Sequence, residues 1–219
     1  WRELTQRSQV PLQQSWTYGT VVAAMGGVVQ RVEVREGRRT IALAQTIGRR
    51  FLLPVTLITR GPVWINATDQ DQRARVLSEL CRTFRGVVLI TPPDDGLGGS
   101  CAEAGMTKVM TPSTLAMLSL RPGLRGLMHG KWRNRLTAAE GSGLMVHRQD
   151  PDSQALEWLL EDDAHQQRCR RYRAMPAAFT KTWQRNDRKN LLLLTAHRGD
   201  ERLAAMLFLR HGNAATYHI

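Results

Sequence analysis

The sequence has 219 residues, 42% of them hydrophobic, and carries 31 Lys and Arg against 19 Asp and Glu, which gives a net charge of +12. A chain of this length and apolar content can bury a core as one large domain or two small ones, which excludes a disordered protein. Its longest apolar runs fall far short of the roughly 20 residues that a membrane-spanning helix needs. We therefore expect a soluble, cytoplasmic protein without a transmembrane segment, and leave a targeting segment before Trp1 open.

The excess of positive charge favours partners that carry phosphate. Candidates are nucleic acid, a nucleotide-linked substrate, a phosphopantetheine cofactor and an anionic membrane surface. Most of the cations are arginine. Because an arginine bias also follows from a GC-rich genome, it is not taken as a sign of RNA binding. The cysteines at positions 81, 101 and 169 have no metal-ligand spacing, which predicts reduced thiols and no metal site.

The first half of the chain predicts a compact α+β unit. Hydrophobic periodicity and turn residues indicate a helix, an antiparallel hairpin, two further strands, a helix capped by Asp69 and a short buried strand. These elements are expected at residues 12–25, 28–36 with 40–46, 50–59 with 62–66, 70–84, and 87–90. The glycine-rich stretch GLGGS at 96–100 follows two aspartates that would repel phosphate, so it is interpreted as a flexible loop.

The second half repeats this order with different lengths. A helix, a strand, two helices and three strands are expected at residues 129–139, 144–147, 152–171, 176–185, 191–198, 202–210 and 214–219. In the first of these helices, Trp132, Leu136 and Ala139 share one side and are predicted to face a core. The similar order of the two halves suggests a duplicated fold, with domains at residues 1–120 and 121–219.

Several short motifs occur along the chain in an order that is typical of one group of proteins. The second half contains KWRNRL, RRYRAMPAAFTKTW, LLLLTA, a GD turn, LAAMLFLRHG and ATYHI, and the first half contains LQQSWTYG and VLITPP. In this order they resemble the FemABX-like acyltransferases of the GNAT superfamily, which include peptidoglycan-bridge aminoacyltransferases. The resemblance covers nearly the whole chain. It implies tandem GNAT-like domains of α+β class, with mixed, mostly antiparallel sheets flanked by helices and a second domain that is incomplete at its C-terminal end.

The resemblance implies an acyltransferase that forms an amide on a small-molecule or peptide amine. Acyl-CoA is the donor we favour. Aminoacyl-tRNA, used on a peptidoglycan-precursor-like acceptor, is the alternative and would make tRNA a partner. In the family, the helix that holds the donor's pyrophosphate would begin just after Ile219, so the donor-binding residues stay unassigned.

One departure from the family weighs against a nucleotide-sugar pentapeptide as acceptor. Peptidoglycan-bridge members commonly carry a lysine a few residues after the W/Y-G pair, whereas this chain has Thr20-Val21-Val22-Ala23 there. A function of another class also stays open, in which a degenerate GNAT fold binds an anion or nucleic acid without catalysis.

Candidate catalytic residues lie on the last predicted strand, where the family places the backbone N–H that stabilises the oxyanion. Tyr217 and His218 are the candidates, and because neighbours on a strand point to opposite faces, at most one faces a cleft. The alternative interpretations are a core aromatic for Tyr217 and a solvent-facing or capping histidine for His218. In the first helix, Trp16 and Tyr18 are expected in the core or at a domain interface.

Candidate substrate-binding residues lie in two basic clusters. The resemblance places acceptor phosphates on Lys131, Arg133 and Arg135, in a segment that also contains Arg121 and Arg125 and no acidic residue before Glu140. The alternative is a solvated helix face.

Arg171 and Tyr172 belong to the second cluster, at the C-terminal end of the helix expected at residues 152–171. The alternative is that its basic residues only complement the dipole of that helix. Asp162 or Asp163 would act as a base only where a cleft closes over it.

Overall fold

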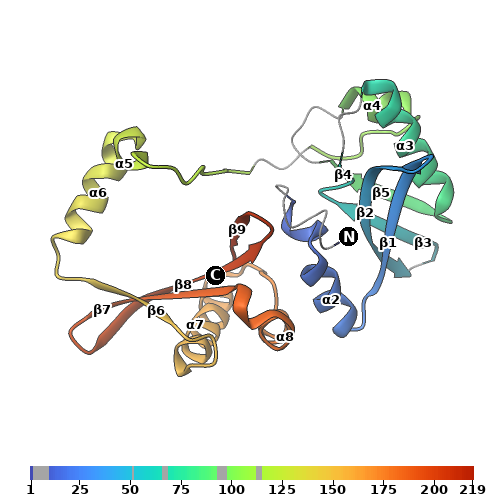
Figure 1. Cartoon of the computed structure of the whole chain (residues 1–219). Coiled ribbons are helices and arrows are strands. Elements are labelled where there is room, and N and C mark those ends of the chain that lie inside the picture. The colour runs from blue at the N-terminus through green and yellow to red at the C-terminus, as the bar shows by residue number, and fades with distance from the viewer. Residues whose placement is uncertain (2–9, 51, 66–68, 93–97, 112–114) are drawn as a thin grey trace.

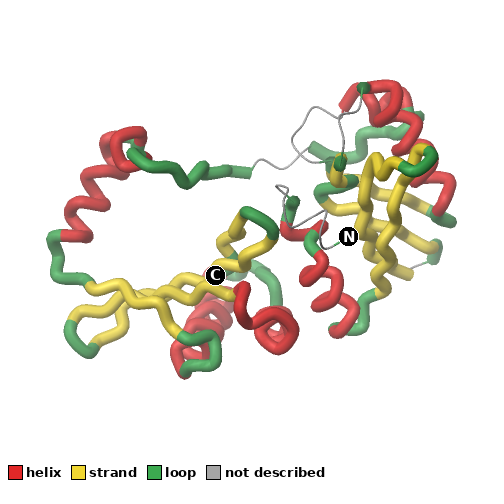
Figure 2. Tube along the Cα trace, in the orientation of Figure 1, coloured by secondary structure: helices red, strands yellow, loops and turns green. Residues whose placement is uncertain are grey.

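The computed structural model describes residues 1, 10–50, 52–65, 69–92, 98–111 and 115–219. This part of the chain contains two β-sheets, both mostly antiparallel and both flanked by helices (Figures 1 and 2). The predicted α+β class is therefore confirmed. Tandem GNAT-like domains with a boundary at residue 120 stay a prediction.

The first sheet has strand order β1-β2-β3-β5, with β4 beside β2. Its strands are β1 (Val28–Glu36), β2 (Arg39–Arg50), β3 (Pro54–Thr59), β4 (Val63–Trp64) and β5 (Val87–Thr91). All pairs are antiparallel except β3 with β5. Residues 41–47 of β2 are all buried. β2 lies between β1 and β3, and the run of consecutive buried residues means that both of its faces are covered.

Helix α3 (Gln70–Thr83) begins at the predicted cap, where Asp69 Oδ1 accepts a hydrogen bond from the Gln72 N–H at 2.7 Å. Its buried side chains include Val76 and Leu80, which pack with residues of β2 and β3. The predicted helix and its cap are therefore confirmed.

The short helix α4 (Gly98–Glu103) contradicts the expected loop over the glycine-rich stretch. The Ser100 side chain is buried, and its hydroxyl donates to the Gln70 carbonyl at 3.2 Å. Packing against α3 therefore overrides the low helix propensity of glycine. The two aspartates that precede the stretch, at 94 and 95, lie outside the described residues.

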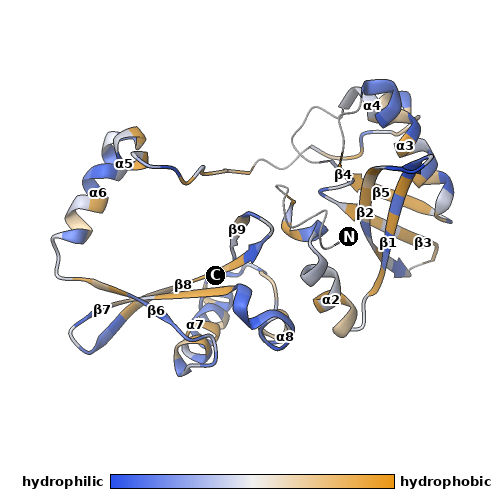
Figure 3. Cartoon of the chain, in the orientation of Figure 1, coloured by the Kyte–Doolittle hydropathy of each residue, from blue (hydrophilic) through white to orange (hydrophobic). Residues whose placement is uncertain are grey.

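The second sheet is wholly antiparallel, in the order β6-β7-β8-β9. Its strands are β6 (Met145–Gln149), β7 (Leu191–Arg198), β8 (Glu201–His211) and β9 (Ala214–Tyr217). One face is packed by the helices α7 (Gln154–Arg170) and α8 (Ala177–Asp187), and α8 continues into the turn η2 (Arg188–Asn190). The buried core beneath these helices includes Leu156, Phe179, Trp183, Leu193 and Leu207. Figure 3 shows the hydrophobic colour along β7 and β8.

The N-terminal turn η1 (Leu12–Gln14) and helix α2 (Trp16–Ala24) pack on the second half of the chain as well as the first. Val21 is buried in the same core cluster as Trp183. The ring of Tyr18 lies 5.7 Å from that of Phe179, which confirms the expected core position of this tyrosine. The predicted first domain thus contributes its first helix to the core of the second sheet.

Two buried glutamines, which we call the glutamine clamp, join η1 to the first sheet. Gln14 Nε2 donates to the carbonyls of Gln45 at 3.0 Å and Thr59 at 2.8 Å, and its Oε1 accepts from the Gln45 N–H at 2.7 Å. In return, Gln45 Nε2 donates to the carbonyls of Gln13 at 3.0 Å and Ser15 at 2.9 Å. The QQS motif therefore fastens the N-terminal segment to β2.

Helices α5 (Leu124–Leu127) and α6 (Gly130–Glu140) stand apart from both sheets (Figure 1). Trp132 is 59% exposed and Leu136 is 37% exposed, and Ala139 is exposed too. The prediction that these three residues face a core is therefore wrong. Periodicity identified an apolar side of the helix correctly, but no residue of α6 is buried in the described structure.

A buried histidine makes stability depend on pH. His211 Nδ1 donates to the Val10 carbonyl at 2.8 Å, and Nε2 accepts from the Thr216 hydroxyl at 2.7 Å. Burial lowers the pKa of His211, more than the Val10 hydrogen bond raises it. The neutral ring is therefore the form that the folded state holds.

We expect the free energy of unfolding to fall as pH drops below about 6.5, the pKa of an unfolded histidine. The folded state takes up the proton only at a lower pH, so acid favours the unfolded chain. Urea unfolding at pH 7 and pH 5 measures this, and His211→Asn should weaken the dependence. Exposed His147→Gln is the control. If the free energy of unfolding falls equally between pH 7 and pH 5 in the two variants, His211 is not the source of the pH dependence.

Candidate functional site

The C-terminal turn of α7 folds the chain back over the helix. Arg171 follows the helix with φ 54° and ψ 39°, a left-handed conformation that glycine usually takes at this position. The Tyr172 N–H donates to the Gln167 carbonyl at 3.2 Å, and the Gln167 side chain accepts from the Ala174 N–H at 3.1 Å. These bonds hold Tyr172 beside the last turns of α7.

The carboxylate of Asp163 lies under this turn. Its Oδ2 accepts from Gln167 Nε2 at 2.7 Å, and its Oδ1 lies 3.4 Å from the Tyr172 hydroxyl. Desolvation raises the pKa of Tyr172, and the charge and hydrogen bond of Asp163 and the nearby Tyr217 raise it further. Tyr172 therefore keeps its proton at neutral pH and can donate it in a hydrogen bond.

The end of β9 brings two more polar side chains to the same edge of the sheet. His218 is half-buried, with Nε2 at 2.8 Å from the Thr180 hydroxyl and its ring 5.7 Å from that of Phe179. Burial lowers the pKa of His218, and the charge of Asp163 opposes this shift. The expectation of a solvent-facing or capping histidine is wrong, because α8 packs against the ring.

Tyr217 points away from α8 and is 60% exposed, with its ring 5.9 Å from that of Phe208. The alternative of a core aromatic is therefore wrong. The side chains linked on the other face, which we call the polar edge cluster, are Asp163, Tyr172, Thr180 and His218. A carboxylate, an imidazole and a phenol can together move a proton.

The polar edge cluster unites three residues that the sequence indicated separately: Asp163, Tyr172 and His218. Tyr217 lies on the opposite face of the sheet, beside Phe208. Arg171 lies in the turn beside them, with an exposed side chain. The second basic group is elsewhere, because Figure 1 places α6 well away from β9. The structure therefore does not bring the two predicted groups of site residues together.

The basic side chains of α6 are exposed. The Arg135 guanidinium lies 5.2 Å from the centre of the Trp132 ring, and Arg133 Nη1 donates to the Gly126 carbonyl at 3.5 Å. Arg125, from α5, forms an ion pair with Glu140 at 2.8 Å. Lys131, Arg133 and Arg135 thus remain a candidate anion site, whereas the charge of Arg125 is already balanced.

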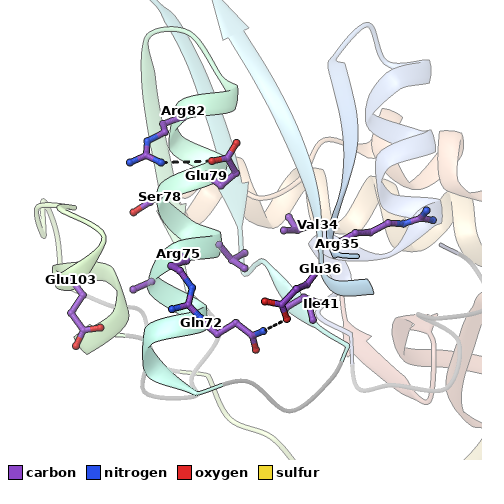
Figure 4. A pocket seen from close by; sticks show the side chains of 12 residues that line it. Val34, Arg35, Glu36, Ile41, Gln72, Arg75, Ser78, Glu79, Arg82 and Glu103 are labelled. Atoms are coloured by element: carbon purple, nitrogen blue, oxygen red, sulfur yellow. Dashed lines mark hydrogen bonds and ion pairs between the residues drawn. The ribbon is translucent and has the colours of Figure 1, made fainter. Parts of the chain in front are cut away.

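Sequence reasoning did not anticipate a groove on the first half of the described structure (Figure 4). It has a volume of about 460 Å³ and lies between the end of β1, α3 and α4. Its polar side chains already have partners: Gln72 of α3 donates to Glu36 of β1 across the groove at 2.9 Å, and Arg82 lies 3.7 Å from Glu79 on the same helix. Charges of both signs line the groove, so it does not favour a ligand of one charge.

The described part of the chain contains no group of three or more His, Cys, Asp and Glu side chains that could hold a metal ion. None of its helices has the length and hydropathy required to cross a membrane.

No family model and no curated protein sequence matches this chain. Among solved structures, a crystal structure of FemX is similar, with a TM-score of 0.64 over 94% of this chain and 12% sequence identity. The chain has a FemX-like fold. It spans 55% of the FemX chain, so the likeness concerns about half of that protein. An identity this low shows the fold, and the chemistry has to be argued from the residues of this chain.

Proposed function

We propose that this protein is an acyltransferase that forms an amide on an amine-bearing acceptor. The observation that carries the proposal is the polar edge cluster at the end of β9, in a chain with a FemX-like fold. Amide formation needs a group that takes the ammonium proton and dipoles that stabilise the oxyanion. Asp163 and the neutral ring of His218 are the proton acceptors in this cluster.

The backbone of β9 supplies the second requirement. β9 is the outermost strand of the described second sheet, so those of its N–H groups that face away from β8 do not bond within the sheet. The FemABX resemblance places the oxyanion-stabilising N–H on this strand. In this proposal a backbone N–H of β9 stabilises the oxyanion. Tyr217 and His218, on opposite faces of the strand, assist the reaction.

The donor is the second part of the proposal. Acyl-CoA is our first choice and aminoacyl-tRNA the second, and both carry phosphates that a basic surface would bind. The experiment incubates the protein with labelled acyl-CoA or charged tRNA and a panel of amines, and follows label transfer. Transfer from acyl-CoA alone supports the first donor, and transfer from tRNA alone supports the second. Binding without transfer from either donor would contradict an enzyme and favour the binding module.

The basic residues of α6 are proposed to bind a phosphate of the donor or acceptor. Arg133→Ala and Arg135→Ala should each weaken binding of acyl-CoA or tRNA about 10- to 100-fold, because a charge-assisted hydrogen bond contributes about 1.5 to 3 kcal/mol. Thermal melting should hardly change, since both side chains are exposed. Titration calorimetry measures the affinity.

The matched control is Arg38→Ala, which removes an equal charge from an exposed position in the β1–β2 turn. If all three variants weaken binding equally, the effect is one of net charge, and α6 is not the site.

A further inference from the structure

Two histidine rings lie side by side on neighbouring strands at the edge of the second sheet. His147 of β6 and His197 of β7 have ring centres 5.5 Å apart, with an angle of 78° between the ring planes. The strand register places both on one face, because His147 lies opposite Thr195, and Thr195 and His197 are two residues apart on β7. The sheet thus brings together two imidazoles that lie far apart in the sequence.

The spacing of the two rings suits two ligands of one metal ion. An imidazole nitrogen binds zinc at about 2.0 to 2.1 Å. Two imidazoles on one ion, with an angle of roughly 90° to 120° between their bonds, therefore have ring centres roughly 4.5 to 5.5 Å apart. The observed 5.5 Å lies at the upper end of this range. His147 is exposed and His197 is half-buried, so an ion from solvent can reach both.

Each ring has a nitrogen left for a metal ion. Among the described residues, His147 makes no side-chain hydrogen bond. His197 Nε2 lies 2.9 Å from the Thr195 hydroxyl, whose oxygen also accepts from Gln149 Nε2 at 3.0 Å. When His197 Nε2 carries the proton and donates it to Thr195, the lone pair of Nδ1 is free. Metal-binding histidines usually donate their other ring N–H in this way, which fixes the orientation of the ring.

A thioether lies beside the histidine pair. Met145 is directly opposite His197 and two residues before His147 on the same face, and it is 59% exposed. Imidazole suits zinc, copper, iron and nickel, whereas a thioether favours Cu⁺. The cation opposite His197 is Arg202, whose guanidinium lies 5.3 Å from the centre of the Trp158 ring on α7. Two imidazoles and one thioether together therefore favour copper.

We propose that His147, His197 and Met145 form a copper-binding site in which the ion bridges β6 and β7. The imidazoles bind Cu²⁺, which has the highest affinity of the divalent first-row metals for such ligands, and the thioether adds a ligand for Cu⁺. The site lies below the threshold of three His, Cys, Asp and Glu side chains, because one of its ligands is a methionine. The prediction of no metal site came from the cysteines, which this site does not use. It is independent of acyl transfer.

The histidines themselves can report where copper binds. The experiment uses tag-free protein with Cys169→Ser, because Cys169 Sγ lies 3.4 Å from His165 Nε2 and that pair also can bind copper. With ¹⁵N-labelled imidazoles, CuSO₄ added in less than equimolar amount should broaden the signals of His147 and His197 first, since Cu²⁺ is paramagnetic. MgCl₂ should change no signal, because Mg²⁺ prefers oxygen ligands. Equal broadening of all six histidines would overturn the site.

Matched histidine variants measure what each ring contributes. His147→Asn and His197→Asn should each weaken Cu²⁺ binding at least about 10-fold, because even the loss of a group that only orients a ligand costs about 10- to 100-fold. His165→Asn removes another exposed histidine and should leave the affinity unchanged. Equal losses in all three variants, or no loss in the first two, would overturn the proposal.

The role of Met145 is tested with reduced copper. Met145→Leu keeps an apolar side chain of similar size and removes the sulfur. In the presence of ascorbate, competition with a chromophoric Cu⁺ chelator should show weaker Cu⁺ binding by this variant, while its affinity for Cu²⁺ should hardly change. An unchanged Cu⁺ affinity would overturn the assignment of Met145 as a ligand.

Discussion

Replacement of Trp183 by alanine is expected to lower the free energy of unfolding by about 3 to 5 kcal/mol. Trp183 is fully buried in α8, in the cluster that joins α7, α8, α2 and the second sheet, with its ring 5.9 Å from that of Phe179. Alanine would leave a cavity where four elements meet, and the neighbours can only partly close it. Urea unfolding followed by circular dichroism measures the loss as a lower midpoint with an unchanged slope.

Trp132→Ala is the matched control, since it removes the same side chain from an exposed position. We expect a change within about 0.5 kcal/mol, as for other surface substitutions. The sequence pattern alone predicted a core position for this tryptophan. A loss as large as that for Trp183 would mean that α6 is packed in solution and would contradict its exposed position.

Replacement of Gln14 by alanine should cost about 2 to 5 kcal/mol. The side chain makes three hydrogen bonds in the glutamine clamp, and alanine would leave the N–H and carbonyl of Gln45 and the carbonyl of Thr59 without this partner. Each buried polar group left unpaired costs about 1 to 3 kcal/mol. Thermal and urea unfolding measure the loss.

The neighbouring glutamine provides the control. Gln13 also has a buried side-chain oxygen, but that oxygen has no hydrogen-bond partner in the described structure. Gln13→Ala should therefore be close to neutral or slightly stabilising. If Gln14→Ala is equally mild, water replaces the lost bonds and the clamp does not hold the N-terminal segment.

Most helices and strands could be predicted because local patterns determine them. The Asp69 cap and the apolar positions of α3 lie within one stretch of sequence, and their interpretation was correct. Local patterns do not show which distant segment packs against each apolar face. Trp132 and Val21 occupy similar apolar patterns, yet Val21 meets a distant core and Trp132 meets solvent.

The candidate site was predicted in part, because local motifs can be read from the sequence and contacts between distant segments cannot. Tyr172, Tyr217 and His218 were indicated by their place in motifs, and Tyr172 and His218 both lie near Asp163. Tyr217 lies on the other face of the sheet, beside Phe208. The role of Asp163 depends on the turn that brings Tyr172 back over α7. That turn has Arg171 in a left-handed conformation. No glycine marks the position, so the sequence gives no local signal for it.

The packing of α2 on the second sheet has a consequence for folding during synthesis. This helix is translated long before its core partners Phe179 and Leu207, which follow much later in the sequence. The bond between His211 and Val10 spans a similar separation. Contacts between distant residues slow folding, because a long loop must close before they can form. The second core therefore cannot close while its helices and strands are still being made, and α2 lacks these core partners until the strand β8 has been translated.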